Sequence, residues 1–167
     1  TATATATRAA TVATLATSSF GYSQSQGTWL VEASKLGLGT SGYLLSINDQ
    51  PGGDDDRFDL YVSNSTNKVH LLIQNAGVTK FNSDVGTALT ANTDFAAAFS
   101  YGPAGVYCSV NGSAPVSVGT VTFPSVDTVS FGMNQANGST LDGSLRRVAY
   151  YETPFGADVQ SLAVVTS

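Results

Sequence analysis

The chain has 167 residues, of which only 11% are charged, and its formal net charge at neutral pH is -5. A chain of this length is a natural size for a single domain with a sizeable core. The seven basic residues are scattered and no apolar run approaches the roughly 20 residues of a membrane span, so we expect neither a nucleic-acid partner nor membrane insertion.

The first seven residues, Thr1 to Thr7, alternate strictly between threonine and alanine. This period of two fits a strand, but neither face is apolar enough to fix its register. We interpret residues 1–7 as an arm or linker that contacts another chain or domain, and residues 8–167 as one domain. Because the sequence begins with Thr1 rather than methionine, we expect a processed product or a piece of a longer protein.

From residue 28 onward, apolar residues recur at every second position in short runs separated by glycine-rich or polar turns. This pattern predicts strands that bury one face. About ten or more such strands, with almost no helical periodicity, predict an all-β, two-sheet antiparallel sandwich. The predicted inward faces are Trp29, Val31 and Ala33; Tyr43, Leu45 and Ile47; Phe58, Leu60 and Val62; Val69, Leu71 and Ile73; Phe95, Ala97, Phe99 and Tyr101; Val106, Cys108 and Val110; and Val129, Phe131 and Met133.

Asn111 and Gly112 give the clearest turn signal, because both central positions of a type I′ turn favour positive φ. They predict a hairpin between residues 106–110 and 114–118. Residues 141–151 predict one long late strand, in which the consecutive Arg146 and Arg147 should point to opposite faces. One of them should therefore point inward or lie flat along a sheet, and we expect one to pair with an aspartate while the other is solvated.

The helix candidate is short and covers residues 157–164, where Val159 and Leu162 are three positions apart and Asp158 lies in the first turn. Gly156 occupies its expected cap. With glycine at this position, we predict a weak or irregular helix.

Four segments carry a resemblance to a known family: LDGSLRRVAYY at 141–151, Arg8-Ala9-Ala10, GTWLVE at 27–32 and Val110-Asn111-Gly112. In order and spacing they resemble the concanavalin A-like (laminin-G-like) jelly-roll domains at the ends of phage tail and fibre proteins. The resemblance implies a jelly-roll sandwich of the concanavalin A-like lectin and glucanase type with one short C-terminal helix.

The resemblance also implies a function. We expect a non-enzymatic structural or attachment domain of a phage fibre or other virion appendage, located on the particle. Such a domain would form homo-oligomers, contact other virion protein chains and recognise host-surface glycans. The alternative from a different class is a lectin-like carbohydrate-binding module assisted by calcium.

Catalytic residues are sparse. The chain has two glutamates, Glu32 and Glu152, far apart in the sequence, and lacks the Glu-x-Asp-x-x-Glu strand of catalytic jelly-roll glucanases. We therefore predict that it is not an enzyme, and keep an aspartate pair between Asp54 and Asp59 as the basis of a depolymerase, the least favoured alternative. His70, the one histidine, lacks a Gly-x-Ser-x-Gly partner and is expected to be an outward strand residue rather than a base.

The binding candidates fall into two groups. Asp54, Asp55 and Asp56 are hard oxygen ligands of the kind calcium prefers, but consecutive carboxylates cannot all face one ion, so a solvated acidic turn is the preferred interpretation. No other cofactor is expected. Tyr61 and Tyr107 are the glycan candidates, because they lie opposite the apolar sets of their strands.

Overall fold

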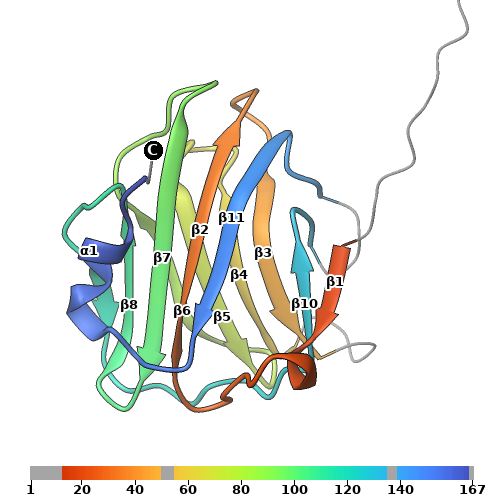
Figure 1. Ribbon diagram of the computed structural model, residues 1–167, viewed down its shortest axis with the longest axis vertical. Helices are drawn as coiled ribbons and strands as arrows, with labels where there is room; N and C mark the ends of the chain where they lie inside the picture. Colours follow the sequence, from red (N-terminus) through yellow and green to blue (C-terminus); the bar gives the residue numbers. More distant parts are fainter. Residues whose placement is uncertain (1–12, 50–54, 135–138, 166–167) are drawn as a thin grey trace, which may run out of the picture.

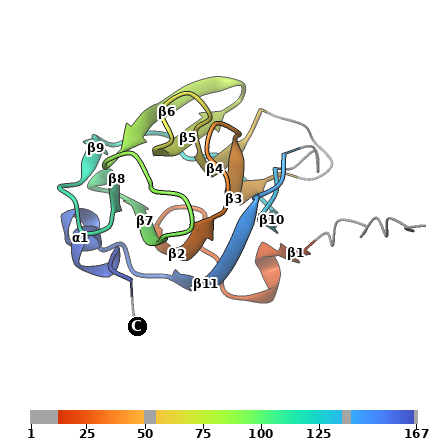
Figure 2. The same cartoon turned by 90° about the horizontal axis from the view of Figure 1, so that it is seen from above.

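The computed structural model describes residues 13–49, 55–134 and 139–165. In this part of the chain, two antiparallel sheets pack face to face, and a short helical segment follows the last strand (Figure 1). Figure 2 shows the two layers from above. The predicted two-sheet antiparallel jelly-roll sandwich is confirmed. The Thr1 to Thr7 arm and Arg8-Ala9-Ala10 lie outside the described residues.

The larger sheet has six strands in the order β1-β10-β3-β4-β5-β6, and the smaller has five in the order β11-β2-β7-β8-β9. The strands of the six-stranded sheet are β1 (Ala13–Ala16), β10 (Thr128–Phe131), β3 (Gly42–Asn48), β4 (Arg57–Val62), β5 (Val69–Asn75) and β6 (Val78–Val85). Those of the five-stranded sheet are β11 (Gly143–Tyr151), β2 (Gly27–Lys35), β7 (Asp94–Gly102), β8 (Gly105–Val110) and β9 (Val116–Val118). A 3-10 turn, η1 (Thr17–Ser19), follows β1.

The core lies between the two sheets, and most predicted inward faces point into it. Trp29 and Phe99 are buried there, and Phe131 packs against the same cluster while half-buried. Burying each large apolar side chain contributes about 1.5–3 kcal/mol to the stability of the fold. The burial of these inward-facing side chains therefore supplies most of the driving force for the two-layer arrangement. The thiol of Cys108 is also buried, as predicted.

The predicted inward position of Tyr43 is wrong. A bulge interrupts the pairing of β3 with β4, so that Tyr43 lies opposite Tyr61 whereas Leu45 lies opposite Leu60. The extra residue is Leu44, which is buried. Because a one-residue shift moves a side chain to the other face of a sheet, Tyr43 joins Tyr61 on the outer face.

A second bulge changes the placement of the two arginines in β11. The register shifts between Leu145 and Arg147, so strict alternation does not hold at Arg146. Arg146 pairs with Asp94, and Arg147 Nη1 lies 3.4 Å from Glu32 Oε1. Arg146 has the expected aspartate partner, but Arg147 also has a carboxylate partner, so the expectation that only one arginine is paired is wrong. Both side chains are exposed, and neither points into the core.

The C-terminal segment covers part of the outer face of the five-stranded sheet (Figure 1). It consists of η2 (Gly156–Asp158) and α1 (Val159–Leu162), which confirms the prediction of an irregular helix. Val159 and Ala163 pack on Leu30, Ala96 and Ala98 of the sheet. Across the described ranges, no helix has the length and apolar character needed to cross a membrane.

The predicted hairpin at Asn111 and Gly112 is confirmed. Their φ angles are 50° and 70°, and the Ser113 N–H donates to the Val110 carbonyl over 2.9 Å. The turn joins β8 to β9, which pair in antiparallel register.

Candidate functional site

One row of side chains crosses four adjacent strands on the outer face of the six-stranded sheet. Tyr43 on β3 lies opposite Tyr61 on β4, Tyr61 opposite His70 on β5, and His70 opposite Asp84 on β6. Side chains that stand on neighbouring strands are close enough to touch, since the strands lie about 4.8 Å apart. We call these four residues the Tyr43–Asp84 row.

The three rings of the row lie against one another. The ring centroids of Tyr43 and Tyr61 are 5.0 Å apart with an angle of 19° between the planes. Those of Tyr61 and His70 are 4.9 Å apart, with an angle of 33°. The rings therefore form a stack that runs across the strands.

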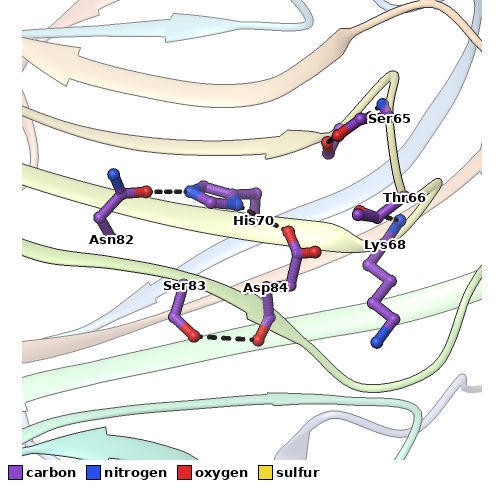
Figure 3. A network of polar contacts seen from close by, with 8 residues as sticks. Ser65, Thr66, Lys68, His70, Asn82, Ser83 and Asp84 are labelled. Carbon is purple, nitrogen blue, oxygen red and sulfur yellow. Dashed lines mark hydrogen bonds and ion pairs between the residues drawn. The ribbon is translucent and has the colours of Figure 1, made fainter.

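Side chains of β6 hold the imidazole at the end of this stack (Figure 3). His70 Nδ1 lies 2.7 Å from Asp84 Oδ1, and Nε2 contacts Asn82 Oδ1. Desolvation alone would raise the pKa of Asp84, but hydrogen bonds from His70 and Thr66 and the nearby charges of His70 and Lys68 outweigh it, so the pKa is lowered. His70 is thus an outward strand residue, as predicted, with a fixed orientation.

A second polar group lies beside the row. Asp59 on β4 is fully buried, accepts a hydrogen bond from Ser46 Oγ over 2.5 Å, and has its Oδ2 3.1 Å from Arg57 Nε. A buried carboxylate held in this way is not placed to contact a substrate, which removes the basis for Asp59 as a catalytic group. Its charge nevertheless acts on the row. Desolvation, followed by the charges of Asp59 and Asp84, raises the pKa of Tyr61.

The two predicted glycan residues lie on different sheets. Tyr61 belongs to the Tyr43–Asp84 row, whereas Tyr107 lies on the outer face of the five-stranded sheet, opposite Ser100 and Ser117. Tyr107 packs against the C-terminal segment, and its hydroxyl donates to the Ala104 carbonyl over 3.3 Å. The structure therefore does not bring them together.

Sequence reasoning missed Tyr43 as a partner of Tyr61. The one signal that could have revealed it is the consecutive pair Leu44-Leu45, since two adjacent apolar residues break the period of two.

The acidic turn is tied to the hairpin between β5 and β6. Asp56 Oδ1 accepts a hydrogen bond from the Ala76 N–H over 2.8 Å, and the Asp55 carbonyl accepts one from the Gly77 N–H over 3.0 Å. Asp54 lies outside the described residues. Among those that are described, no three His, Cys, Asp or Glu side chains come together as metal ligands would.

Two hollows lie away from the row. One, of about 250 Å³, opens where β1 and β11 form the edge of the sandwich, and the other, of about 370 Å³, adjoins the C-terminal segment near Gly112 and Gln160. The first is lined by apolar and aromatic side chains, namely Leu15, Phe20, Trp29, Phe131, Val148 and Tyr150. The hydroxyl of Tyr150 is already bonded to the Ser23 N–H and the Gln26 carbonyl, so this hollow offers few polar groups to a ligand.

The similarity of this chain to known proteins lies in its fold. No known family pattern and no curated protein matches the sequence. Among solved structures, the CBM40 carbohydrate-binding module of the Ruminococcus gnavus IT-sialidase bound to α2,3-sialyllactose is similar over 85% of this chain and 84% of its own, with a TM-score of 0.70 and 20% identity.

Two further structures share the fold. A leech intramolecular trans-sialidase has a TM-score of 0.70 and 16% identity over 86% of this chain, which spans only 24% of the leech protein. A heptameric SAP-like pentraxin from Limulus polyphemus has a TM-score of 0.62 and 15% identity, over 81% of this chain and 68% of its own. At such identities the likeness shows the fold alone: a concanavalin A-like β-sandwich.

Proposed function

We propose that this domain is a non-enzymatic carbohydrate-binding module whose ligand lies on the outer face of the six-stranded sheet. The observation that carries the proposal is the Tyr43–Asp84 row, in which hydroxyl, imidazole and carboxylate groups from four strands are held in one line. Saccharide hydroxyls both donate and accept hydrogen bonds, and a line of mixed donors and acceptors matches them.

The outer faces of the two sheets differ, and the difference favours the six-stranded sheet as the binding surface. The central part of the five-stranded sheet carries Leu30, Ala96 and Ala98, and the C-terminal segment packs on them. The four residues of the row on the other sheet are polar and half-buried. The fold likeness to the Ruminococcus gnavus module, whose structure holds sialyllactose, supports the same class of function. The proposal gives calcium no role.

An NMR titration of the isotope-labelled domain tests the proposal. α2,3-Sialyllactose and lactose serve as probes, each with and without a chelator. We expect amide shifts that centre on the Tyr43–Asp84 row and do not change when the chelator is added. Shifts confined to the hollow at Gly112 and Gln160, or no shift with either probe or with a wider glycan panel, would contradict it.

Two exposed amide side chains provide a matched pair of variants. Asn82 contacts His70 at the row. Gln160 lies in the C-terminal segment, on the five-stranded sheet, and donates to the Gly112 carbonyl over 2.7 Å. Asn82→Ala is expected to weaken glycan binding because it releases the imidazole, whereas Gln160→Ala is expected to leave binding unchanged.

The virion location, the homo-oligomer and the contacts with other virion chains are a separate hypothesis, which rests on the sequence resemblance. The structures named above belong to sialidases and a pentraxin. Immunogold labelling of purified particles with an antibody against this domain tests the location, and labelling absent from intact particles would count against it.

A further inference from the structure

The position of Tyr61 within the stack limits how it can contact a ligand. β4 lies between β3 and β5 in the sheet, so Tyr61 has the ring of Tyr43 on one side and that of His70 on the other. Both neighbouring rings are within 5.0 Å of its centroid and inclined by 33° or less. Each face of the Tyr61 ring therefore has another ring beside it.

The two neighbouring rings obstruct the usual way in which a tyrosine contacts a sugar. A saccharide packs its C–H groups on the open face of an aromatic ring, whereas a neighbouring ring lies beside each face of Tyr61. Side chains stand roughly perpendicular to a sheet, so the part of Tyr61 that points away from the sheet is the ring edge that bears the hydroxyl.

The surroundings of this hydroxyl favour its protonated form. Desolvation raises the pKa of Tyr61, and the negative charges of Asp59 and Asp84 raise it further, against a smaller opposing effect of Arg57. The group thus remains a phenol that can donate a hydrogen bond as well as accept one. Its neighbour along the row, His70, is engaged by Asp84 and Asn82.

We infer that Tyr61 determines ligand specificity through its hydroxyl group, which hydrogen-bonds a saccharide hydroxyl or ring oxygen, while its ring serves as a spacer between Tyr43 and His70. This inference rests on the proposed function and deepens it. The ligand is a saccharide recognised by the positions of its hydroxyl groups along the row rather than by an apolar ring face.

The test compares Tyr61→Phe with Tyr107→Phe. Each variant removes one hydroxyl and keeps the ring, and the Tyr107 hydroxyl lies on the other sheet, where it donates to the Ala104 carbonyl. Affinity for α2,3-sialyllactose and lactose is measured by NMR titration, and amide spectra together with denaturation midpoints verify that both variants are folded. Loss of one hydrogen bond predicts roughly threefold to tenfold weaker binding for Tyr61→Phe and no change for Tyr107→Phe.

The outcomes separate the two proposals. If the unaltered domain binds and Tyr61→Phe binds equally well, the hydroxyl role is overturned while the carbohydrate-binding function stands. If both variants weaken binding to the same extent, the effect is not specific to the row, and the inference also fails. If the unaltered domain binds neither probe nor a wider glycan panel, the proposed function itself fails. Deoxy analogues of a bound probe add a further check, because the analogue that lacks the partner hydroxyl should lose no additional affinity in Tyr61→Phe.

Discussion

The carboxylate of Asp59 lies 3.1 Å from the guanidinium of Arg57, two residues earlier on the same strand. Both side chains project from the outer face of β4, yet the Asp59 side chain is fully buried and that of Arg57 is only 16% exposed. Desolvation of a charged pair is costly unless further hydrogen bonds satisfy it, and Ser46 supplies one to Asp59. The polar face of the six-stranded sheet therefore contains a structural ion pair beside the proposed binding row.

Removal of Asp59 should destabilise the domain strongly. Asp59→Ala leaves the Arg57 charge largely buried without this carboxylate, which typically costs about 3–5 kcal/mol of unfolding free energy. Asp94→Ala is the matched control, because the Asp94–Arg146 pair is exposed and such pairs contribute about 0–1 kcal/mol. Urea denaturation of both variants measures the difference, and equal losses for the two variants would contradict the structural role of Asp59.

Asp84 should make stability depend on pH in the acid range. Its pKa in the folded protein is lowered, so the native state binds fewer protons at this site than the unfolded chain. The stabilisation is fully present above the unfolded value of about 3.9 and is lost as the pH falls through the lower folded value. Asp84→Asn should flatten the curve of unfolding free energy against pH in this window. An unchanged slope in the variant would show that other carboxylates control the acid transition.

The sequence predicts the sandwich and its core because most strands point every second side chain into the space between the sheets, which imposes a period of two on apolar residues such as Trp29 and Phe99. The Tyr43–Asp84 row could not be predicted in full, since it depends on a bulge that turns Tyr43 outward. The register between successive strands also determines it, and alternation within one strand does not say which residue of the next strand lies opposite. The bulge in β11 defeats the prediction for Arg146 in the same way.

Cys108 should be unreactive in the folded domain. Its side chain is fully buried, and desolvation raises the pKa of the thiol far above its ordinary value, so almost no thiolate forms at neutral pH. A chromogenic disulfide reagent should therefore label no thiol in the native protein and one thiol per chain in denaturant. Rapid labelling of the native protein would mean that β8 opens far more often than a core strand should.

The start of β11 should tolerate no side chain larger than hydrogen at Gly143. A Cβ atom built there would lie 2.0 Å from the Ser34 carbonyl oxygen and 2.9 Å from the Lys35 Cα atom, both of which belong to the backbone of β2. Since backbone cannot rotate away as a side chain can, Gly143→Ala should push β11 from β2 and lower the unfolding free energy by about 1–3 kcal/mol. Gly119→Ala is the matched control, because a Cβ atom there meets nothing within 4 Å. Thermal denaturation of the two variants should show a lower midpoint for Gly143→Ala alone; an unchanged midpoint would mean that β11 approaches β2 less closely than the structure shows.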